Sequence, residues 1–242
     1  MIIFAAVLVA AVAFAVRQRE NLKLLYSAKT SSTEEIVVKA ETSKQEQQKA
    51  LKDKGVDVAP PSLEQLDGLL DGKTSADDVK QSLGLTESPR STEPAQPPSK
   101  PEQKPQEDGT KPEEKTSEQT ETAEQRAKKA QEYTDQCVKA LYAYEVDLMS
   151  DLGALKQQAI DEYTALPPEK QTKQTKADLG LKYLNICYDM EVVADGNVQG
   201  LLKQLRSDLT AIGAETDIAD TLWLHYCEEK ATTKEYYLSK YL

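Results

Sequence analysis

The longest amphipathic stretch of the chain, residues 133–166, reads YTDQCVKALYAYEVDLMSDLGALKQQAIDEYTAL. Its apolar side chains recur at steps of four, four and three residues, which places them on one side of an α-helix. These positions are Tyr133, Cys137, Leu141, Tyr144, Leu148, Leu152, Leu155, Ala159, Tyr163 and Leu166. This period is about 3.67 residues per turn, so the stripe runs nearly straight along the helix. The stretch therefore predicts one long helix with a single buried face.

Two breaks follow, at Leu166-Pro167-Pro168 and at residues 213–217, and they separate two further helical patterns. The second pattern carries Leu181, Leu184, Tyr188, Val192, Val198, Leu202, Leu205, Leu209 and Ile212. The third begins near Asp217 and presents Ile218, Leu222, Trp223, Tyr226, Cys227, Ala231, Tyr237 and Tyr241. Short connections make neighbouring helices antiparallel. We therefore predict an all-α protein whose residues 126–242 form an antiparallel three-helix bundle.

The segment before this bundle has a composition that opposes folding. Residues 91–125 hold six prolines, nine acidic residues and four lysines, with no aromatic residue and no Val, Ile, Leu or Met. Such a segment has too little apolar surface to offset the loss of chain entropy. We predict a disordered linker rich in Pro, Glu and Lys over residues 86–125, acting as a spacer.

Two weaker helical units precede the linker. Ser62 is a candidate N-cap for the first of two short helices within residues 62–85 and Thr74 or Ser75 for the second, with a turn at Asp71-Gly72 between them. Helices of this length are marginal alone, so this small helical pair needs a partner. The apolar residues of 20–61 are too sparse for a packed face, and we expect a juxtamembrane helical stem there.

The N-terminus is uninterruptedly apolar. Residues 2–16 contain only Ile, Phe, Ala, Val and Leu, and as a helix they would extend roughly 22 Å. We interpret residues 1–19 as a membrane anchor or signal-like segment that contacts lipid through residues 2–16, with Arg17 and Arg19 at the interface. The alternative is a secreted protein cleaved near Ala15, at a small-x-small site.

The two indications of membrane orientation disagree. Arg17, Arg19 and Lys23 follow the apolar run, and the positive-inside rule then places the body of the protein in the cytoplasm. The signal-like site and the proline-rich linker, whose composition resembles the wall-spanning linkers of Gram-positive surface proteins, favour the outside. We expect an extracytoplasmic C-terminal domain.

Charge excludes one class of partner. The net charge is −11 and no segment is basic, so a nucleic-acid partner is not expected. The three cysteines, Cys137, Cys187 and Cys227, lie one on each predicted helix of the bundle. Because their number is odd, one of them stays free or pairs between chains if the domain is outside the cell, and the alternative is that they are small buried residues of the core.

The sequence shows no set of residues typical of catalysis or metal binding. His225 is the only histidine, which excludes motifs that need two histidines within one chain. His225 and Cys227 point to different sides of a helix and cannot form a nucleophile–base pair. We expect no enzyme activity, no cofactor and no metal.

Tyrosine is the one residue type that points to recognition. Ten of the eleven tyrosines follow residue 126, where there is no phenylalanine. Tyrosine is enriched at binding surfaces, and the alternative is that these tyrosines are boundary residues of thin helical layers. The C-terminal residues Tyr236, Tyr237 and Tyr241 are the candidate binding face, with Trp223 as the inward anchor of the same helix. Since adjacent residues point about 100° apart, we expect Tyr237 to be buried with Trp223 and Tyr236 to be more exposed.

Together these observations predict a non-enzymatic, single-pass membrane-tethered protein that presents a helical interaction module on a disordered stalk at a bacterial cell surface. Its partner would be a protein or another component of the cell envelope. A cytoplasmic-side membrane scaffold that recruits a soluble partner is the alternative.

Overall fold

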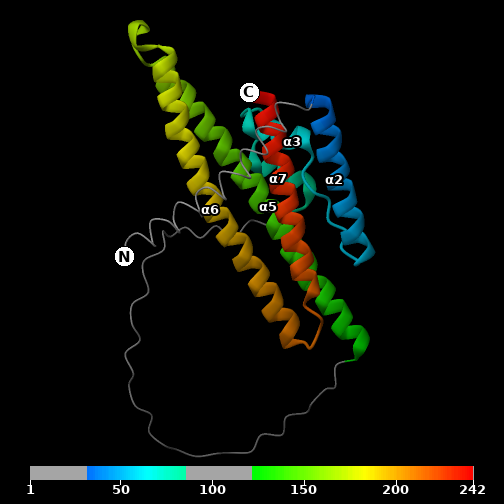
Figure 1. The fold of residues 1–242 in the computed structure, drawn as a ribbon. Helices are drawn as coiled ribbons and strands as arrows, with labels where there is room; N and C mark the ends of the chain where they lie inside the picture. The colour runs from blue at the N-terminus through cyan, green and yellow to red at the C-terminus, as the bar shows by residue number, and fades with distance from the viewer. Residues whose placement is uncertain (1–31, 86–121, 242) are drawn as a thin grey trace, which may run out of the picture.

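The computed structural model describes residues 32–85 and 122–241, and Figure 1 shows their arrangement. The described residues form six α-helices and one 3₁₀ turn, with no strand among them. The all-α prediction is therefore confirmed for this part of the chain. The predicted anchor at 1–19 and almost all of the predicted linker at 86–125 lie outside the described residues. Among the helices that are described, none combines the length and the apolar character needed to span a membrane.

Two long helices make up the largest part of the fold. Helix α5 covers Ala123–Thr164 and α6 covers Lys173–Ala211, and a short 3₁₀ turn at Pro168–Lys170 joins them into a hairpin. Thr122 begins α5 with a capping box, in which its hydroxyl and the Gln125 side chain bond each other's backbone N–H. Thr172 caps α6 in a similar way through the N–H of Thr175. Both helix boundaries therefore follow local sequence signals.

Helix α7, Asp217–Tyr241, runs back along the lower part of this hairpin, as Figure 1 shows. Gly213 ends the preceding turn with φ +66°, a conformation that favours glycine. The core formed here by α5, α6 and α7 includes Cys137, Val138, Val198, Leu202, Leu205, Leu209, Ile218, Ala219 and Leu222. The three helices thus run up, down and up, and their buried residues meet in one cluster.

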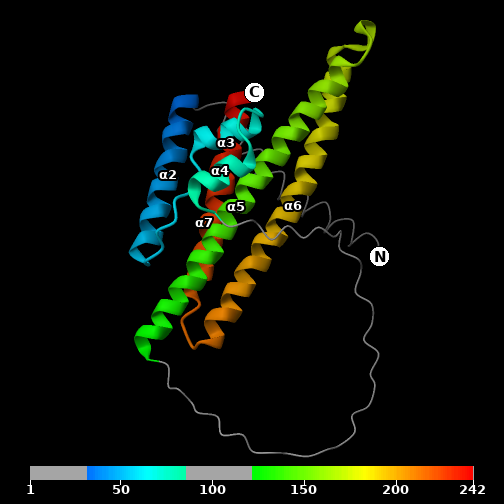
Figure 2. The same ribbon diagram turned by 180° about the vertical axis from the view of Figure 1, so that it is seen from behind.

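The remaining helices pack against the same three. Helix α2 covers Thr33–Asp53 and lies along α7, while α3, Leu63–Leu70, and α4, Ala76–Leu83, lie on α5, as seen from behind in Figure 2. Serine caps begin all three helices, including the predicted caps Ser62 and Ser75. The predicted small helical pair is therefore present, and its packing partner is α5. Whether residues 126–242 fold without it stays a prediction.

The prediction of a stem without a packed face is wrong for α2. Ile36, Ala40 and Leu51 are each at most 3% exposed. The face is completed by Lys44 and Gln47, which are also buried. Because two of the five inward positions are polar, the face is not recognisable as an apolar stripe.

Helix α5 is buried on two sides rather than one. Besides the predicted stripe, a second face carries Val146, Met149 and Gly153, and these residues pack beneath α3 and α4. A side chain at Gly153 would place its Cβ 2.5 Å from the carbonyl oxygen of Leu69, so glycine is required for the close approach of α3. The sequence pattern of α5 indicates only one buried face. The second face is covered by α3 and α4, and these short helices have too few apolar side chains for their packing on α5 to be expected.

Candidate functional site

The C-terminal tyrosines lie at a junction between three helices. Tyr236 on α7 is 7% exposed and clusters with Ile36 and Ala40 of α2 and with Leu63 of α3. Its hydroxyl donates a hydrogen bond of 2.7 Å to Oδ2 of Asp67. Burial, together with this bond to a carboxylate, raises the pKa of Tyr236. Tyr236 therefore holds α7, α2 and α3 together.

The expected exposures of the two adjacent tyrosines are wrong. Tyr236 is buried, whereas Tyr237 is only partly buried and packs edge-on against it with ring centroids 4.9 Å apart. The reason is that α7 packs along α2 as well as against α6, and residues of α2 and α3 surround the ring of Tyr236. A helix covered on two sides can bury both of two adjacent side chains. Tyr236 is thus unavailable as part of an open binding face.

Trp223, the expected inward anchor, is partly buried. It packs against the core of α5, α6 and α7, and its ring lies 5.5 Å from the ring of Tyr226. Tyr241 is the last residue of α7. The binding role assigned to the three C-terminal tyrosines stays a prediction, and for Tyr236 the packing opposes it.

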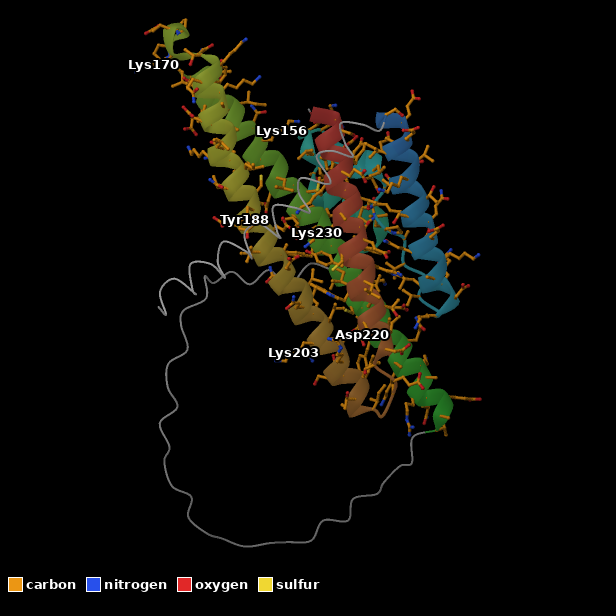
Figure 3. The ribbon with its side chains drawn as sticks, in the orientation of Figure 1. Lys156, Lys170, Tyr188, Lys203, Asp220 and Lys230 are labelled. Atoms are coloured by element: carbon orange, nitrogen blue, oxygen red, sulfur yellow. The ribbon has the colours of Figure 1, made fainter. Side chains whose placement is uncertain are left out.

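The largest departure from the sequence pattern lies on α6. Four residues expected to be buried are exposed instead, and we call them the α6 stripe: Leu181 at 62%, Leu184 at 63%, Tyr188 at 39% and Val192 at 45%. Further along the same helix, Val198, Leu202, Leu205 and Leu209 are all buried as expected. Figure 3 labels Tyr188 on the exposed half of α6 and Lys203 lower on the same helix.

The α6 stripe continues the side of α6 that α7 covers. Leu184 and Tyr188 precede Glu191 and Asp195 by seven residues, or two helical turns, and so lie on the same side of the helix. Glu191 and Asp195 both bind Lys230 of α7, at 3.3 Å and 2.6 Å.

Helix α7 turns away from α6 just beyond these ion pairs. Lys234 still binds Glu191, at 2.5 Å, but the next residue, Glu235, binds Lys39 of α2 at 2.6 Å. Tyr236 then binds Asp67, as described above. These contacts draw the end of α7 toward α2 and α3, and the tip of the α5–α6 hairpin extends past it (Figures 1 and 2). The α6 stripe is exposed because α7 no longer lies against this part of α6.

A second unusual feature is a charged cluster inside the protein. Nζ of Lys44 on α2 lies 2.7 Å from Oε1 of Glu229 on α7 and 3.6 Å from Oε1 of Glu145 on α5. The ammonium group also donates a hydrogen bond of 2.9 Å to the carbonyl oxygen of Pro61. The contact with Glu229 is an ion pair rather than a directed hydrogen bond, since Oε1 of Glu229 has no partner of good hydrogen-bond geometry. Two carboxylates therefore share one ammonium group.

The environment of this cluster shifts its proton affinities. Burial and the neighbouring Glu229 raise the pKa of Glu145 to about 7, against the opposing effect of Lys44. Burial also raises the pKa of the nearby Tyr142 hydroxyl, and the same two carboxylates add to that shift. This cluster is not recognisable from the sequence, because its three members lie on three different helices and each resembles a surface charge.

The other chemical groups in the described residues are isolated. No group of three or more His, Cys, Asp and Glu side chains in residues 32–85 and 122–241 is placed to hold a metal ion. The three cysteines are free thiols, and burial raises the pKa of each of them. Desolvation lowers the pKa of His225.

The chain was compared with protein-family models, with curated proteins and with solved structures, and none of the three comparisons found a match.

Proposed function

We propose that this protein is a non-enzymatic, membrane-tethered binding protein, whose helices recruit another protein through the α6 stripe. In this proposal residues 2–16 anchor the chain, residues 86–125 act as a flexible spacer, and the helical part is displayed outside a bacterial cell. Display on the cytoplasmic side, or secretion after cleavage near Ala15, would use the same binding surface.

The observation that carries this proposal is the exposure of the α6 stripe. Leu181 and Leu184 are more than 60% exposed, whereas the corresponding apolar side chains in the other half of the same helix are buried. Single exposed apolar residues are ordinary, but four of them in line on one helix form a surface of the kind used for protein contacts. The hairpin that carries them extends past the rest of the helices (Figure 1).

The stripe fits an amphipathic helix as its partner. It continues the side of α6 that α7 covers lower down, so a helix of the same kind would complete a three-helix arrangement around the hairpin. Along one flank, Asp178 and Asp189 lie three turns apart and make no ion pair in the described part of the chain. A partner with Lys or Arg beside its apolar face would pair with them, as Lys230 and Lys234 of α7 pair with α6.

Site-specific photo-crosslinking tests this proposal directly. A photoreactive phenylalanine analogue replaces Leu184 in the full-length protein, expressed in the cells that make it, and the adducts are mapped by mass spectrometry. The matched control places the same group at Lys203, which is exposed on the same helix outside the stripe. We expect adducts at position 184, in excess of the control, with an amphipathic helix of another protein that carries basic residues. Adducts with lipid or with a second copy of the chain, or no excess over the control, would contradict the proposed partner.

The tether is tested separately. An Ala10→Arg substitution places a charge in the middle of the apolar run, which costs ~2.5–3.5 kcal/mol on insertion scales. We expect the wild-type protein to resist alkaline carbonate extraction and the variant to be released from membranes. A soluble wild-type form that begins at Val16 would instead support cleavage and secretion.

A further inference from the structure

The three helices of the first half of the chain, α2, α3 and α4, have no core of their own. We call residues 32–85, which contain them, the strap. Each of these helices packs mainly on α5 or α7 rather than on the other two. Every cluster of buried apolar residues that includes part of the strap also includes residues of α5 or α7. Because helices as short as α3 and α4 are marginal without packing, the order of the strap depends on its docking.

Polar contacts also cross between the strap and the C-terminal helices. Three ion pairs join α2 to α7, and in each the lysine comes from α2 and the carboxylate from α7: Lys39 with Glu235 at 2.6 Å, Lys44 with Glu229 at 2.7 Å, and Lys54 with Asp217 at 2.9 Å. Residue numbers rise along α2 while those of the partners fall, so the two helices are antiparallel. The pairs follow almost the whole of α2, and its charges therefore match those of α7.

A more shielded ion pair fastens the other end of the strap to α5. Nζ of Lys80 on α4 lies 3.0 Å from Oδ1 of Asp147, and the two side chains are only 14% and 10% exposed. Asp71, which ends α3, also binds Lys156 of α5 at 2.7 Å. A charge so far from water is destabilising when its partner is lost, and more so when the partner is replaced by a like charge. Docking of the strap is therefore sensitive to the charge at position 80.

The strap also lies on the shortest path from the N-terminus to the fold. Helix α2 begins at Thr33, close to the end of α7, and the tip of the α5–α6 hairpin extends past this same end of the molecule (Figures 1 and 2). Only 16 residues, 17–32, separate α2 from the apolar run of residues 2–16. Sixteen residues reach at most ~55 Å. Without docking, the connection to α5 comprises residues 17–122, which are 106 residues.

We propose that the strap is a second, non-covalent attachment between the N-terminal end of the chain and the C-terminal helices. It bypasses the predicted spacer, so the spacer does not set the distance from the N-terminus while the strap is docked. If residues 2–16 are in a membrane, as in the proposed function, the docked strap keeps the α6 stripe close to that membrane. The partner of the stripe is then a helix near the same membrane surface, and undocking of the strap extends the reach.

Cutting the chain within the predicted spacer tests this second attachment. A site for a sequence-specific protease is inserted after Lys104 of the full-length protein, and open membrane fragments from cells that make it are washed after cleavage. We expect the C-terminal fragment to stay with the membranes as the uncut protein does, because the strap still binds α5 and α7. Complete release of the fragment by the cut overturns the proposal.

A charge reversal within the strap shows whether docking is what retains the fragment. Lys80→Glu places a carboxylate against Asp147 and leaves the sequence of the C-terminal fragment unchanged. We expect the released share of the fragment to increase several-fold after cleavage. The matched control is Lys49→Glu, the same change at an exposed position of α2, which should release no more than the wild type. Equal retention with Lys80→Glu and with the wild type overturns the proposal, because the fragment is then held by something other than the strap.

The uncut protein separates this proposal from the proposed tether. If the uncut protein is not found with the membranes, the tether is wrong, and the strap is then tested in solution. Gel filtration of the cleaved wild-type protein should give the two fragments in one peak, and Lys80→Glu should separate them. Separate elution of the wild-type fragments overturns the strap whatever the outcome for the tether.

Discussion

Leu202 and Leu184 are on the same helix at positions that the sequence pattern treats alike, yet Leu202 is 2% exposed and Leu184 is 63% exposed. Around Leu202 the helix α6 lies against both α5 and α7. Around Leu184 only α5 remains, because Glu235 and Tyr236 tie the end of α7 to α2 and α3. Burial in this protein is thus decided by where α7 lies, and the periodicity of α6 cannot show where α7 leaves it.

The largest difference in stability is expected between variants in which one of these two leucines is truncated to alanine. Leu202→Ala leaves a cavity in the core and should lower the free energy of unfolding by ~2–5 kcal/mol. Leu184→Ala removes an exposed side chain and should change it by less than about 0.5 kcal/mol. Urea denaturation of the two variants measures both. Equal losses would mean that the α6 stripe is covered within the isolated protein.

Two glycines show the same contrast between a covered and an uncovered position. Gly153→Ala should destabilise the protein by ~1–3 kcal/mol, because its Cβ would lie 2.5 Å from the backbone oxygen of Leu69 and α3 would have to move. Gly196 on α6 has no neighbouring atom within 4 Å of such a Cβ. Gly196→Ala should therefore stabilise the helix by up to about 1 kcal/mol. Thermal melting of the two variants should give shifts of opposite sign, and a stabilised Gly153→Ala would disprove the close approach of α3 to α5.

The sequence predicted the helices well and their partners poorly. The ends of α5 and α6 follow from Pro167-Pro168 and from the caps at Thr122 and Thr172, which are local signals. The second buried face of α5 depends on α3 and α4, which are too short for their sequence pattern to indicate a packing surface. The buried face of α2 contains Lys44 and Gln47, whose polarity hides it. These features depend on contacts between segments that are far apart in the sequence. Such contacts cannot be predicted from a local sequence pattern.

The candidate site was missed for the same reason. The sequence pattern places Tyr236 on the open side of α7 because it contains no sign that α2 packs along that helix. The exposed part of α6 was expected to be core because its apolar spacing is that of a buried helix. The buried Tyr236 and the exposed Leu184 are two consequences of one event, the turn of α7 toward α2.

The hydroxyl of Tyr236 should measure how firmly α7 is held at that turn. Tyr236→Phe keeps the ring and removes the hydrogen bond to Asp67, which should cost ~0.5–1.5 kcal/mol or somewhat more because the acceptor is charged. A double-mutant cycle with Asp67→Asn isolates the interaction between the two side chains. Additive losses would show that the bond contributes nothing to the junction.

A small effect is also expected for an ion pair at the tip of the hairpin. Lys182 binds Glu162 at 2.6 Å, but both side chains are more than one-third exposed. Such pairs contribute little, so Lys182→Gln should change the free energy of unfolding by less than about 1 kcal/mol. Urea denaturation in low and high salt checks this, and a large loss that persists in high salt would mean that the pair is more shielded from solvent than the structure indicates.

Hydrogen exchange along α6 tests most directly the division of this helix into a covered and an uncovered half. The amides of residues 198–209 should exchange only through global unfolding, whereas those of residues 177–192 should exchange faster through local opening of the two-helix tip. Urea at low concentration should then accelerate exchange in the first set and leave the second almost unchanged. Equal protection of both sets in the isolated protein would contradict the division, because it would mean that the α6 stripe already has a partner.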